Sequence, residues 1–358
     1  MVGERSSSSD SLVKGAFGEI NRVRLIREYF ATLDKETRGS RSAWVHVYKL
    51  LLWIDQTTGL GHCYESDKCQ PGKPWYGRSL AFHDWVSNEF EVQPAELAAE
   101  IDWLFIRATE DLAKEVRSRS KNLSNRAEEQ RAPYEGRSFP SPGDDPEMAA
   151  IVDRALEAHL SSAPTVEVWS QLTQEIRQYV SLANKRKNLV GEGFEDVLCE
   201  IFRHHCQDGT SVSARKALSE IPGFGFHKKE DKPNKVDIAI ISDSKKTLIT
   251  AKWSVRADRE KQFLTDFDDY VGAKSESGPF DYIFITNEFD PARLKRACEL
   301  EQRNALIFTK VVHVNTNAIV ATYNSPSSKN NLSDSMRSVV AYIESGRLVS
   351  LDSWLNEI

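Results

Sequence analysis

An acid and a lysine on two neighbouring apolar runs are the residues of this chain best suited to chemistry. Asp237 lies among aliphatic residues at 236–241, and Lys252 ends the run 247–252. The polar cluster 242–246 between the runs is typical of a hairpin turn, so we expect the two strands to pair. A carboxylate beside an ammonium in such surroundings is unfavourable unless a cation or a reaction explains it.

The chemistry that this pair indicates is metal-dependent cleavage of a phosphodiester. Asp237 would hold a divalent cation, and Lys252 would orient the attacking water or stabilise the charge that develops on the phosphate. For an isolated pair with this spacing, a strand-edge acid and a solvated lysine would be the simpler interpretation. The elements around the pair favour the catalytic interpretation over this simpler one.

The elements around the pair form an α/β pattern. Apolar spacing predicts helices at 191–206, 257–272 and 291–301 and strands at about 224–228, 236–241, 247–252, 282–286 and 306–309. Stretches at 311–314 and 319–323 are expected to extend the sheet, and helices are expected at 333–345 and 351–358. Asp290 followed by Pro291 is a clear helix start. The predicted fold class is therefore α/β (α+β), with a central mixed sheet flanked by helices.

The chain before this pattern is predicted to be mostly helical. Helices are expected at 17–33, 42–55, 79–90, 94–117, 146–160 and 166–184. The resulting division is a disordered N-terminus at 1–14, whose serine run cannot bury apolar surface, a helical domain at 15–118, a polar linker or mobile loop at 119–146, and a catalytic domain at 147–358.

Composition is that of a soluble globular protein. The 358 residues are 40% hydrophobic and 28% charged, with a net charge of −6. No apolar run is long enough to span a bilayer, the N-terminus has no apolar secretion signal, and five scattered cysteines suit reduced thiols. We therefore expect a cytoplasmic protein. The negative charge argues against a non-specific nucleic-acid coat protein but not against a DNA enzyme.

The order of elements resembles the core of PD-(D/E)xK nucleases. The resemblance covers about residues 189–310 and is carried by Glu195, Asp237 and the tripeptide Thr250-Ala251-Lys252. This family often presents a metal-site glutamate on the preceding helix, as Glu195 would be. One departure from the family pattern is tolerable: Val236 stands before the aspartate in place of proline.

The second departure is Thr250, which occupies the position of the second acid and is a poor metal ligand. This variant resembles the type II restriction endonucleases that recognise CCGG-like sites. They show S/T-x-K and carry the carboxylate on the following helix, about fourteen residues beyond the lysine. That position is Asp266 in this chain, with Asp269 and Glu260 as alternatives. A cation needs carboxylate oxygens at a point in space, whichever element supplies them.

The resemblance implies a type II restriction endonuclease, a hydrolase that cuts double-stranded DNA at a specific sequence. Mg²⁺ would be held by Asp237, Asp266 and Glu195, and Lys252 would position water for in-line attack that leaves a 5′-phosphate. A homodimer is expected because two strands must be cut, and the family implies a cognate DNA methyltransferase.

Five further residues are expected to contact DNA. Ser254, Arg256 and Arg259 follow the catalytic lysine directly, and Lys73 and Arg78 belong to a basic and aromatic loop. The alternative for Arg256 and Arg259 is that they lie at a solvated helix start and pair with nearby acids. The alternative for the loop is ordinary packing around its aromatic side chains.

Three other classes stay open from the sequence. One is a different nuclease of this fold, acting in repair, on DNA junctions or on modified DNA. The second is a non-catalytic DNA-binding protein with a decayed nuclease core, which Thr250 permits and Asp266 opposes. The third is a cytoplasmic interaction protein. A zinc site at His62, Cys63 and Cys69 is disfavoured by their spacing.

Overall fold

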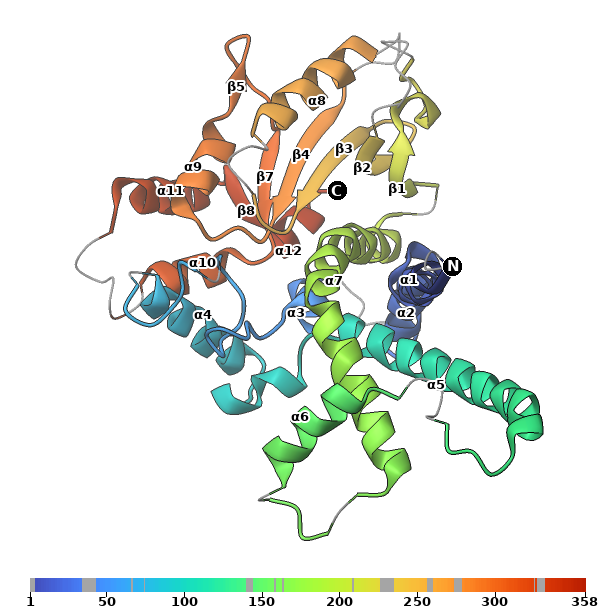
Figure 1. Cartoon of the computed structure of the whole chain (residues 1–358). Coiled ribbons are helices and arrows are strands. Elements are labelled where there is room, and N and C mark those ends of the chain that lie inside the picture. The colour runs from blue at the N-terminus through green and yellow to red at the C-terminus, as the bar shows by residue number, and fades with distance from the viewer. Residues whose placement is uncertain are drawn as a thin grey trace. The chain divides into compact units, whose positions relative to one another are not determined.

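The computed structural model describes residues 4–33, 43–65, 67–73, 75–139, 144–157, 159–162, 164–207, 209–225, 235–255, 260–273, 279–324, 326 and 332–358. The chain forms two compact units (Figure 1). Unit 1 comprises Met1–Leu25 and Phe105–Leu189, and unit 2 comprises Ile26–Leu104 and Val190–Ile358.

Helices account for most of the described chain. The helices are α1 (Glu4–Phe17), α2 (Glu19–Ala31), α3 (Ala43–Leu51), α4 (Tyr76–Glu89), α5 (Trp103–Arg131), α6 (Pro146–Leu156), α7 (Val166–His205), α8 (Glu260–Ala273), α9 (Pro291–Glu299), α10 (Thr316–Tyr323), α11 (Asp334–Glu344) and α12 (Leu351–Leu355). Short 3₁₀ helices are η2 (Pro94–Ala99), η3 (Ala132–Tyr134) and η4 (Leu218–Glu220). No helix within the described ranges is both long and apolar enough to cross a membrane.

Unit 2 is built on a six-stranded sheet of order β1-β2-β3-β4-β7-β8 (Figure 1). Its strands are β1 (Ser211–Ala217), β2 (Lys235–Ile241), β3 (Lys246–Lys252), β4 (Asp281–Thr286), β7 (Lys310–His313) and β8 (Leu348–Ser350). The first three strands pair antiparallel and the remaining pairs are parallel. A separate two-stranded hairpin joins β5 (Glu301–Gln302) to β6 (Ala305–Leu306). The predicted α/β class with a mixed central sheet flanked by helices is confirmed.

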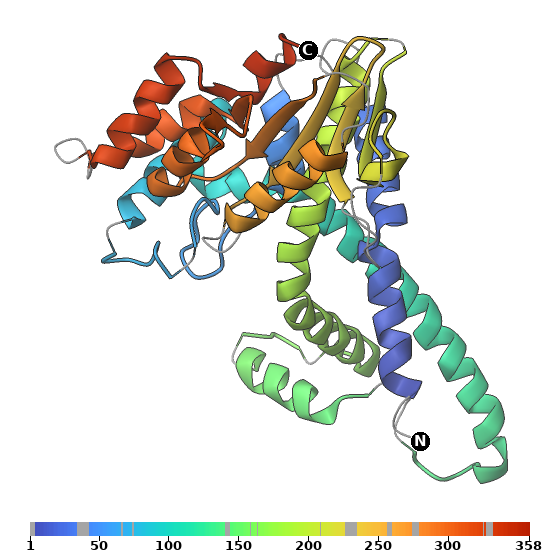
Figure 2. The same cartoon turned by 90° about the horizontal axis from the view of Figure 1, so that it is seen from above.

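Aromatic packing fixes α8 on one face of the sheet (Figure 2). The ring of Phe263 lies 5.2 Å from that of Phe284 on β4, and Phe267 stacks on Tyr282 of the same strand at 6.1 Å. Phe284 is paired with Thr250 across β3 and β4. Residues directly opposite each other on paired strands share a face, so α8 covers the face that carries Thr250.

Unit 1 is held together by a small core and by polar contacts between its helices. Phe17 of α1 packs 5.7 Å from Phe105 of α5, and the Arg186 guanidinium of α7 lies 4.0 Å from the Phe105 ring. Arg117 of α5 pairs with Glu175 of α7. The helices predicted for this region are present. Polar side chains supply much of the contact between them.

Two predicted boundaries differ in unit 1. Helix α1 occupies most of the segment 1–14 that was expected to be disordered. Helix α5 continues to Arg131 through the first part of the expected linker 119–146. This stretch is rich in Arg, Lys, Glu and Gln, which favour helix even where they bury little.

The compact units also divide the chain differently from the predicted helical and catalytic domains. Residues 26–104 belong to the same unit as the sheet. The Tyr48 hydroxyl of α3 donates to Asn287 Oδ1 at 2.9 Å, and the Phe82 ring of α4 packs 4.7 Å from Phe289. Both contacts join the early helices to the loop after β4, which the sequence pattern assigns to another domain.

Helix α7 is continuous where two helices were predicted. It runs from Val166 to His205 and includes residues 185–190, between the two predicted helices. Gly193 is a packing residue of this helix. A Cβ atom there would lie 3.1 Å from Leu51 Cδ2 and 3.2 Å from Leu104 Cδ2. Glycine allows neighbouring side chains to approach the helix closely in this place, although it is usually a helix breaker.

Two strand predictions are wrong. Residues 319–323 lie in α10, whose N-cap Asn315 accepts a hydrogen bond from Asn317 N at 2.9 Å, so cap chemistry and helix packing override β-branched composition. Residues 307–309 lie between β6 and β7 and belong to neither strand.

The strand predicted at 224–228 lies mostly outside the described residues, and its first two residues lie outside the named strands. The edge strand β1 was not predicted, because it is a run of small and polar residues without an apolar pattern.

Candidate functional site

Asp237 of β2 accepts three hydrogen bonds at one carboxylate oxygen. Its Oδ2 atom lies 2.6 Å from Lys252 Nζ, 3.0 Å from Thr250 Oγ1 and 3.0 Å from Ala251 N, all on β3. No described residue donates a hydrogen bond to Oδ1, and 20% of the side chain is exposed. The carboxylate is thus held by one oxygen, and the other accepts no hydrogen bond from the described residues.

The register of the hairpin explains this geometry. Ile238 is paired with Ile249, so Asp237 lies one step further along, opposite Thr250. Residues two apart on a strand point to the same face, which places Lys252 on the side of Thr250. The structure therefore brings together the acid and the lysine that the sequence singled out.

Glu195 of α7 joins the same group. Its Oε1 atom lies 3.9 Å from Lys252 Nζ, and its Oε2 atom accepts a hydrogen bond from Arg215 of β1 at 3.0 Å. The second arm of Arg215 lies 2.5 Å from Asp196 Oδ1. Acids and bases therefore alternate in the order Asp196, Arg215, Glu195, Lys252, Asp237.

Burial changes the acidity of Glu195 within this group. The pKa of Glu195 is raised to about 7, chiefly by burial and next by the negative charge of Asp237, against the opposing effects of Lys252 and Arg215. A carboxyl group in this state loses its proton readily when a cation arrives beside it, because the cation favours the charged form.

Asp266 of α8 faces the same part of the sheet. The pKa of the buried Tyr282 hydroxyl is raised well above its usual value by burial and then by Tyr270, Asp266 and Asp237. Both carboxylates therefore lie close enough to act on one ring. Asp269 raises the pKa of Tyr270, together with Asp266 and Asp237. Asp266 and Asp269 therefore lie near Tyr270, and the described residues do not gather Asp266, Asp237 and Glu195 into one three-acid metal cluster.

The residues of this site fit a magnesium ion that is bound by few protein ligands. Mg²⁺ in phosphoryl chemistry is usually held by one or two carboxylates and completed by phosphate oxygens and water. Asp237 and Glu195 supply two carboxylates around one lysine. Over the ranges that the structure describes, no cluster of three or more His, Cys, Asp or Glu side chains is assembled for a metal ion. Asp237 and Glu195 are therefore the carboxylates that the described structure holds beside Lys252.

The expected DNA-contacting residues after β3 are only partly described. Ser254 is exposed directly beyond the strand. Arg256 and Arg259 lie outside the described residues, and nothing follows for their roles. The side chain of Glu260, the remaining alternative ligand, is also outside them.

The other two expected DNA contacts differ from each other. Lys73 is exposed. Arg78 is engaged inside the protein, because its guanidinium lies 4.7 Å from the Trp75 ring and donates to Met336 Sδ at 3.3 Å. Lys73 is therefore the better placed of the two to meet a phosphate.

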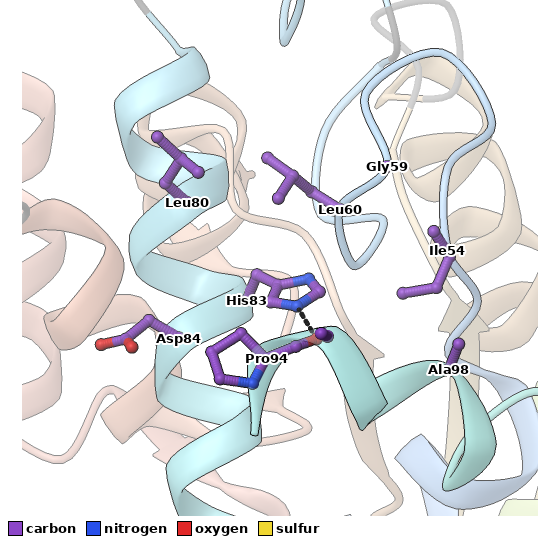
Figure 3. Close-up of a pocket in the computed structure, with 9 residues that line it drawn as sticks. Ile54, Gly59, Leu60, Leu80, His83, Asp84, Pro94 and Ala98 are labelled. Carbon is purple, nitrogen blue, oxygen red and sulfur yellow. Dashed lines mark hydrogen bonds between the residues drawn. The ribbon is translucent and has the colours of Figure 1, made fainter. Parts of the chain in front are cut away.

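The loop before α4 is held by His83 (Figure 3). Gly61 N donates to His83 Nδ1 at 2.9 Å, and His83 Nε2 lies 2.8 Å from Pro94 O. A pocket of about 480 Å³ opens beside this histidine, lined mostly by apolar residues such as Leu60 and Leu80. Both ring nitrogens are used in structural hydrogen bonds, so His83 positions the loop. Cys63 is buried nearby and donates to Ser79 Oγ at 3.4 Å.

Two residues of the site were not foreseen from the sequence. Arg215 lies on the unpredicted strand β1. Glu288, which is 3% exposed, accepts hydrogen bonds from Val255 N at 2.8 Å, Phe289 N at 3.0 Å and Asp290 N at 2.8 Å. It thereby fastens the segment after Lys252 to the loop after β4. The only signal in the sequence was an acid between a buried strand and a helix cap.

No protein-family model matches this chain, and no curated protein matches it.

Proposed function

We propose that this protein is a Mg²⁺-dependent endodeoxyribonuclease of the type II restriction class, with a PD-(D/E)xK-like core. The observation that carries the proposal is the convergence of Lys252 and Thr250 on one oxygen of Asp237, with Glu195 on the far side of the lysine. The order of β2, β3 and β4 in the mixed sheet, with α7 before and α8 after β3, is compatible with this core.

The chain's own residues have distinct tasks in this proposal. Asp237 would bind Mg²⁺ with Asp266 and Glu195, and the bound ion would supply a Lewis acid for the phosphate and its attacking water. Lys252 holds its ammonium beside the metal-binding carboxylate, where it positions the water for in-line attack and stabilises the negative charge of the pentavalent phosphorus.

Thr250 has a supporting task that explains why this position can lack an acid. Its hydroxyl donates to Asp237 Oδ2 at 3.0 Å, so it orients the carboxylate and leaves Oδ1 for the ion. Groups that orient a metal ligand in this way are a regular part of metal sites. The missing carboxylate is then supplied by α8.

The biological setting follows from the same proposal. Double-stranded cleavage requires two active sites, so the working species would be a homodimer on a two-fold symmetric DNA site. A cognate DNA methyltransferase would protect the cell's own copies of that site. Both proteins would act in the cytoplasm.

Nicking of a supercoiled plasmid tests the proposal. The wild-type protein should convert the plasmid to open and linear forms with Mg²⁺ and not with EDTA, and Asp237→Ala should leave it supercoiled. Asp243→Ala is the matched control, since Asp243 is an exposed turn residue of the same hairpin. Cleavage by folded Asp237→Ala at the wild-type rate would refute the assignment.

A further inference from the structure

Arg215 has an unusual backbone conformation for a strand residue. Its φ is 51°, and among the described non-glycine residues with positive φ it is the one that lies within a strand of the central sheet. Such conformations are unfavourable for side chains other than glycine and persist where the surroundings demand them. The surroundings of Arg215 should therefore explain why the chain keeps it there.

The position of Arg215 in the sheet is next to the candidate site. Ala214 is paired with Ile238 and Lys216 with Val236, so the register places Arg215 opposite Asp237. No ladder pair forms at this step. The left-handed conformation thus interrupts the pairing of β1 with β2 beside the residue that would bind the metal.

The guanidinium of Arg215 spans two consecutive acids of α7. One arm lies 3.0 Å from Glu195 Oε2 and the other 2.5 Å from Asp196 Oδ1. Consecutive helical residues point about 100° apart, so one side chain reaches both only through a planar, two-armed group. This contact leaves Glu195 Oε1 on the side of Lys252, at 3.9 Å from its Nζ.

We infer that Arg215 is a positioning residue for the metal site. It fixes the carboxylate of Glu195 by one oxygen and thereby holds the other toward Lys252 and Asp237, while Asp196 anchors the arginine from behind. The inference rests on the proposed function, because it assigns Arg215 a role toward the ion that Glu195 would share. The strained backbone is the means by which β1 directs this side chain to α7.

The test uses Arg215→Gly, which removes the side chain and suits the positive φ. Arg203→Ala is the matched control, because Arg203 also pairs with a glutamate of α7, Glu200, outside the site. The first readout is the rise of the unfolding temperature with added Mg²⁺ or Ca²⁺, without DNA. The second is single-turnover cleavage against Mg²⁺ concentration, and the third is binding of a DNA duplex in saturating Ca²⁺.

For Arg215→Gly the metal concentration giving half of the thermal shift should rise by about 10- to 100-fold, as for other residues that orient a ligand. The Mg²⁺ concentration for half-maximal cleavage should rise in parallel, while duplex binding in saturating Ca²⁺ stays near wild type. Arg203→Ala should match wild type in all three measurements.

Removal of the arginine takes one partner away from the buried Asp196, so a second variant guards against loss of folding. Arg215→Gly with Asp196→Asn also removes this buried charge, and it should fold and show the same weakened metal response. Arg215→Lys replaces the two-armed guanidinium by a single ammonium group. Its metal concentration for half of the thermal shift should lie between those of wild type and Arg215→Gly.

Two results would overturn the inference on its own. An unchanged metal titration in a folded variant would remove any positioning role. Weaker duplex binding with an unchanged metal titration would make Arg215 a phosphate contact instead. Wild-type protein that shows neither a metal-dependent thermal shift nor cleavage would overturn the proposed function together with this inference.

Discussion

Lys252 Nζ lies 2.6 Å from Asp237 Oδ2, an oxygen that also accepts the Thr250 hydroxyl. The ammonium and the hydroxyl therefore orient one side of the carboxylate and leave the other side open. In the proposed site Thr250 would orient the metal ligand Asp237 and would not be a ligand itself. Further ligand carboxylates would then have to come from α7 and α8.

Lys252→Ala should abolish cleavage without abolishing DNA binding. Loss of the ammonium removes both the orientation of water and the stabilisation of phosphate charge, so the single-turnover rate should fall by about 100-fold or more. Duplex binding in Ca²⁺, followed by fluorescence anisotropy, should stay within a few-fold of wild type. Lys245→Ala, at the turn of the same hairpin, is the control. A variant that no longer unfolds cooperatively would mean that Lys252 is structural.

Asp266→Ala should be as damaging as Lys252→Ala, because α8 would supply the carboxylate that β3 lacks. Thr250→Glu in the Asp266→Ala background should restore part of the activity by returning an acid to the strand. Cleavage rates at several Mg²⁺ concentrations would measure both effects.

The matched control for Asp266 is its neighbour Asp269, which lies three residues further along the same helix. Asp269→Ala should keep most of the wild-type rate. Full activity of Asp266→Ala would refute its assignment, and the opposite pattern between the two variants would transfer the role to Asp269.

The stability of the metal-free protein should fall as the pH rises from about 4.5 to about 7. Burial and the charge of Asp237 raise the pKa of Glu195 to about 7 in the folded state, against 4.5 in the unfolded chain. The folded protein binds this proton more tightly between those values, so the free energy of unfolding decreases over that range by at most on the order of 3 kcal/mol. Urea unfolding at several pH values would measure the slope.

Glu195→Gln should flatten that slope, since the amide does not titrate. Glu192→Gln, on an exposed part of the same helix, should keep it. The same slope in wild type and in Glu195→Gln would assign the proton to another group. Saturating Mg²⁺ should also reduce the slope in wild type, because the ion favours the charged carboxylate.

Glu288→Ala should destabilise unit 2 strongly. Its carboxylate accepts three backbone N–H groups and one arm of Arg293, and these groups would lose their partner in a buried place. We expect a loss of about 3 kcal/mol or more in urea unfolding. Glu299→Ala, at an exposed pair of α9, should cost less than about 1 kcal/mol. Equal effects would mean that Glu288 does not fasten the loop.

The sequence was informative where local patterns and burial agree. Strands β2, β3 and β4 are aliphatic runs between polar turns, and Asp290 before Pro291 caps α9 as expected. The hairpin alone placed Asp237 near Lys252, because pairing and the two-residue period of a strand fix which side chains meet.

The sequence was uninformative where tertiary contacts decide. Strand β1 pairs through its backbone and has no apolar run, so neither it nor Arg215 was visible. The helices predicted at 166–184 and 191–206 are one continuous helix, and the close approach of Leu51 and Leu104 at Gly193 was not visible in the sequence. The position of Asp266 relative to Asp237 depends on aromatic packing of α8 over β4, which no spacing rule contains.

The central claim is that the Asp237 and Lys252 pair cuts DNA at a specific sequence. The most direct measurement is digestion of a large unmethylated viral genome by the wild-type protein and by Asp237→Ala, with Mg²⁺, followed by sequencing of the fragment ends. The account predicts discrete fragments with one common end sequence and 5′-phosphates for wild type, and intact DNA for the variant. An intact genome with folded wild-type protein, and equally intact methylated and branched DNA, would contradict it.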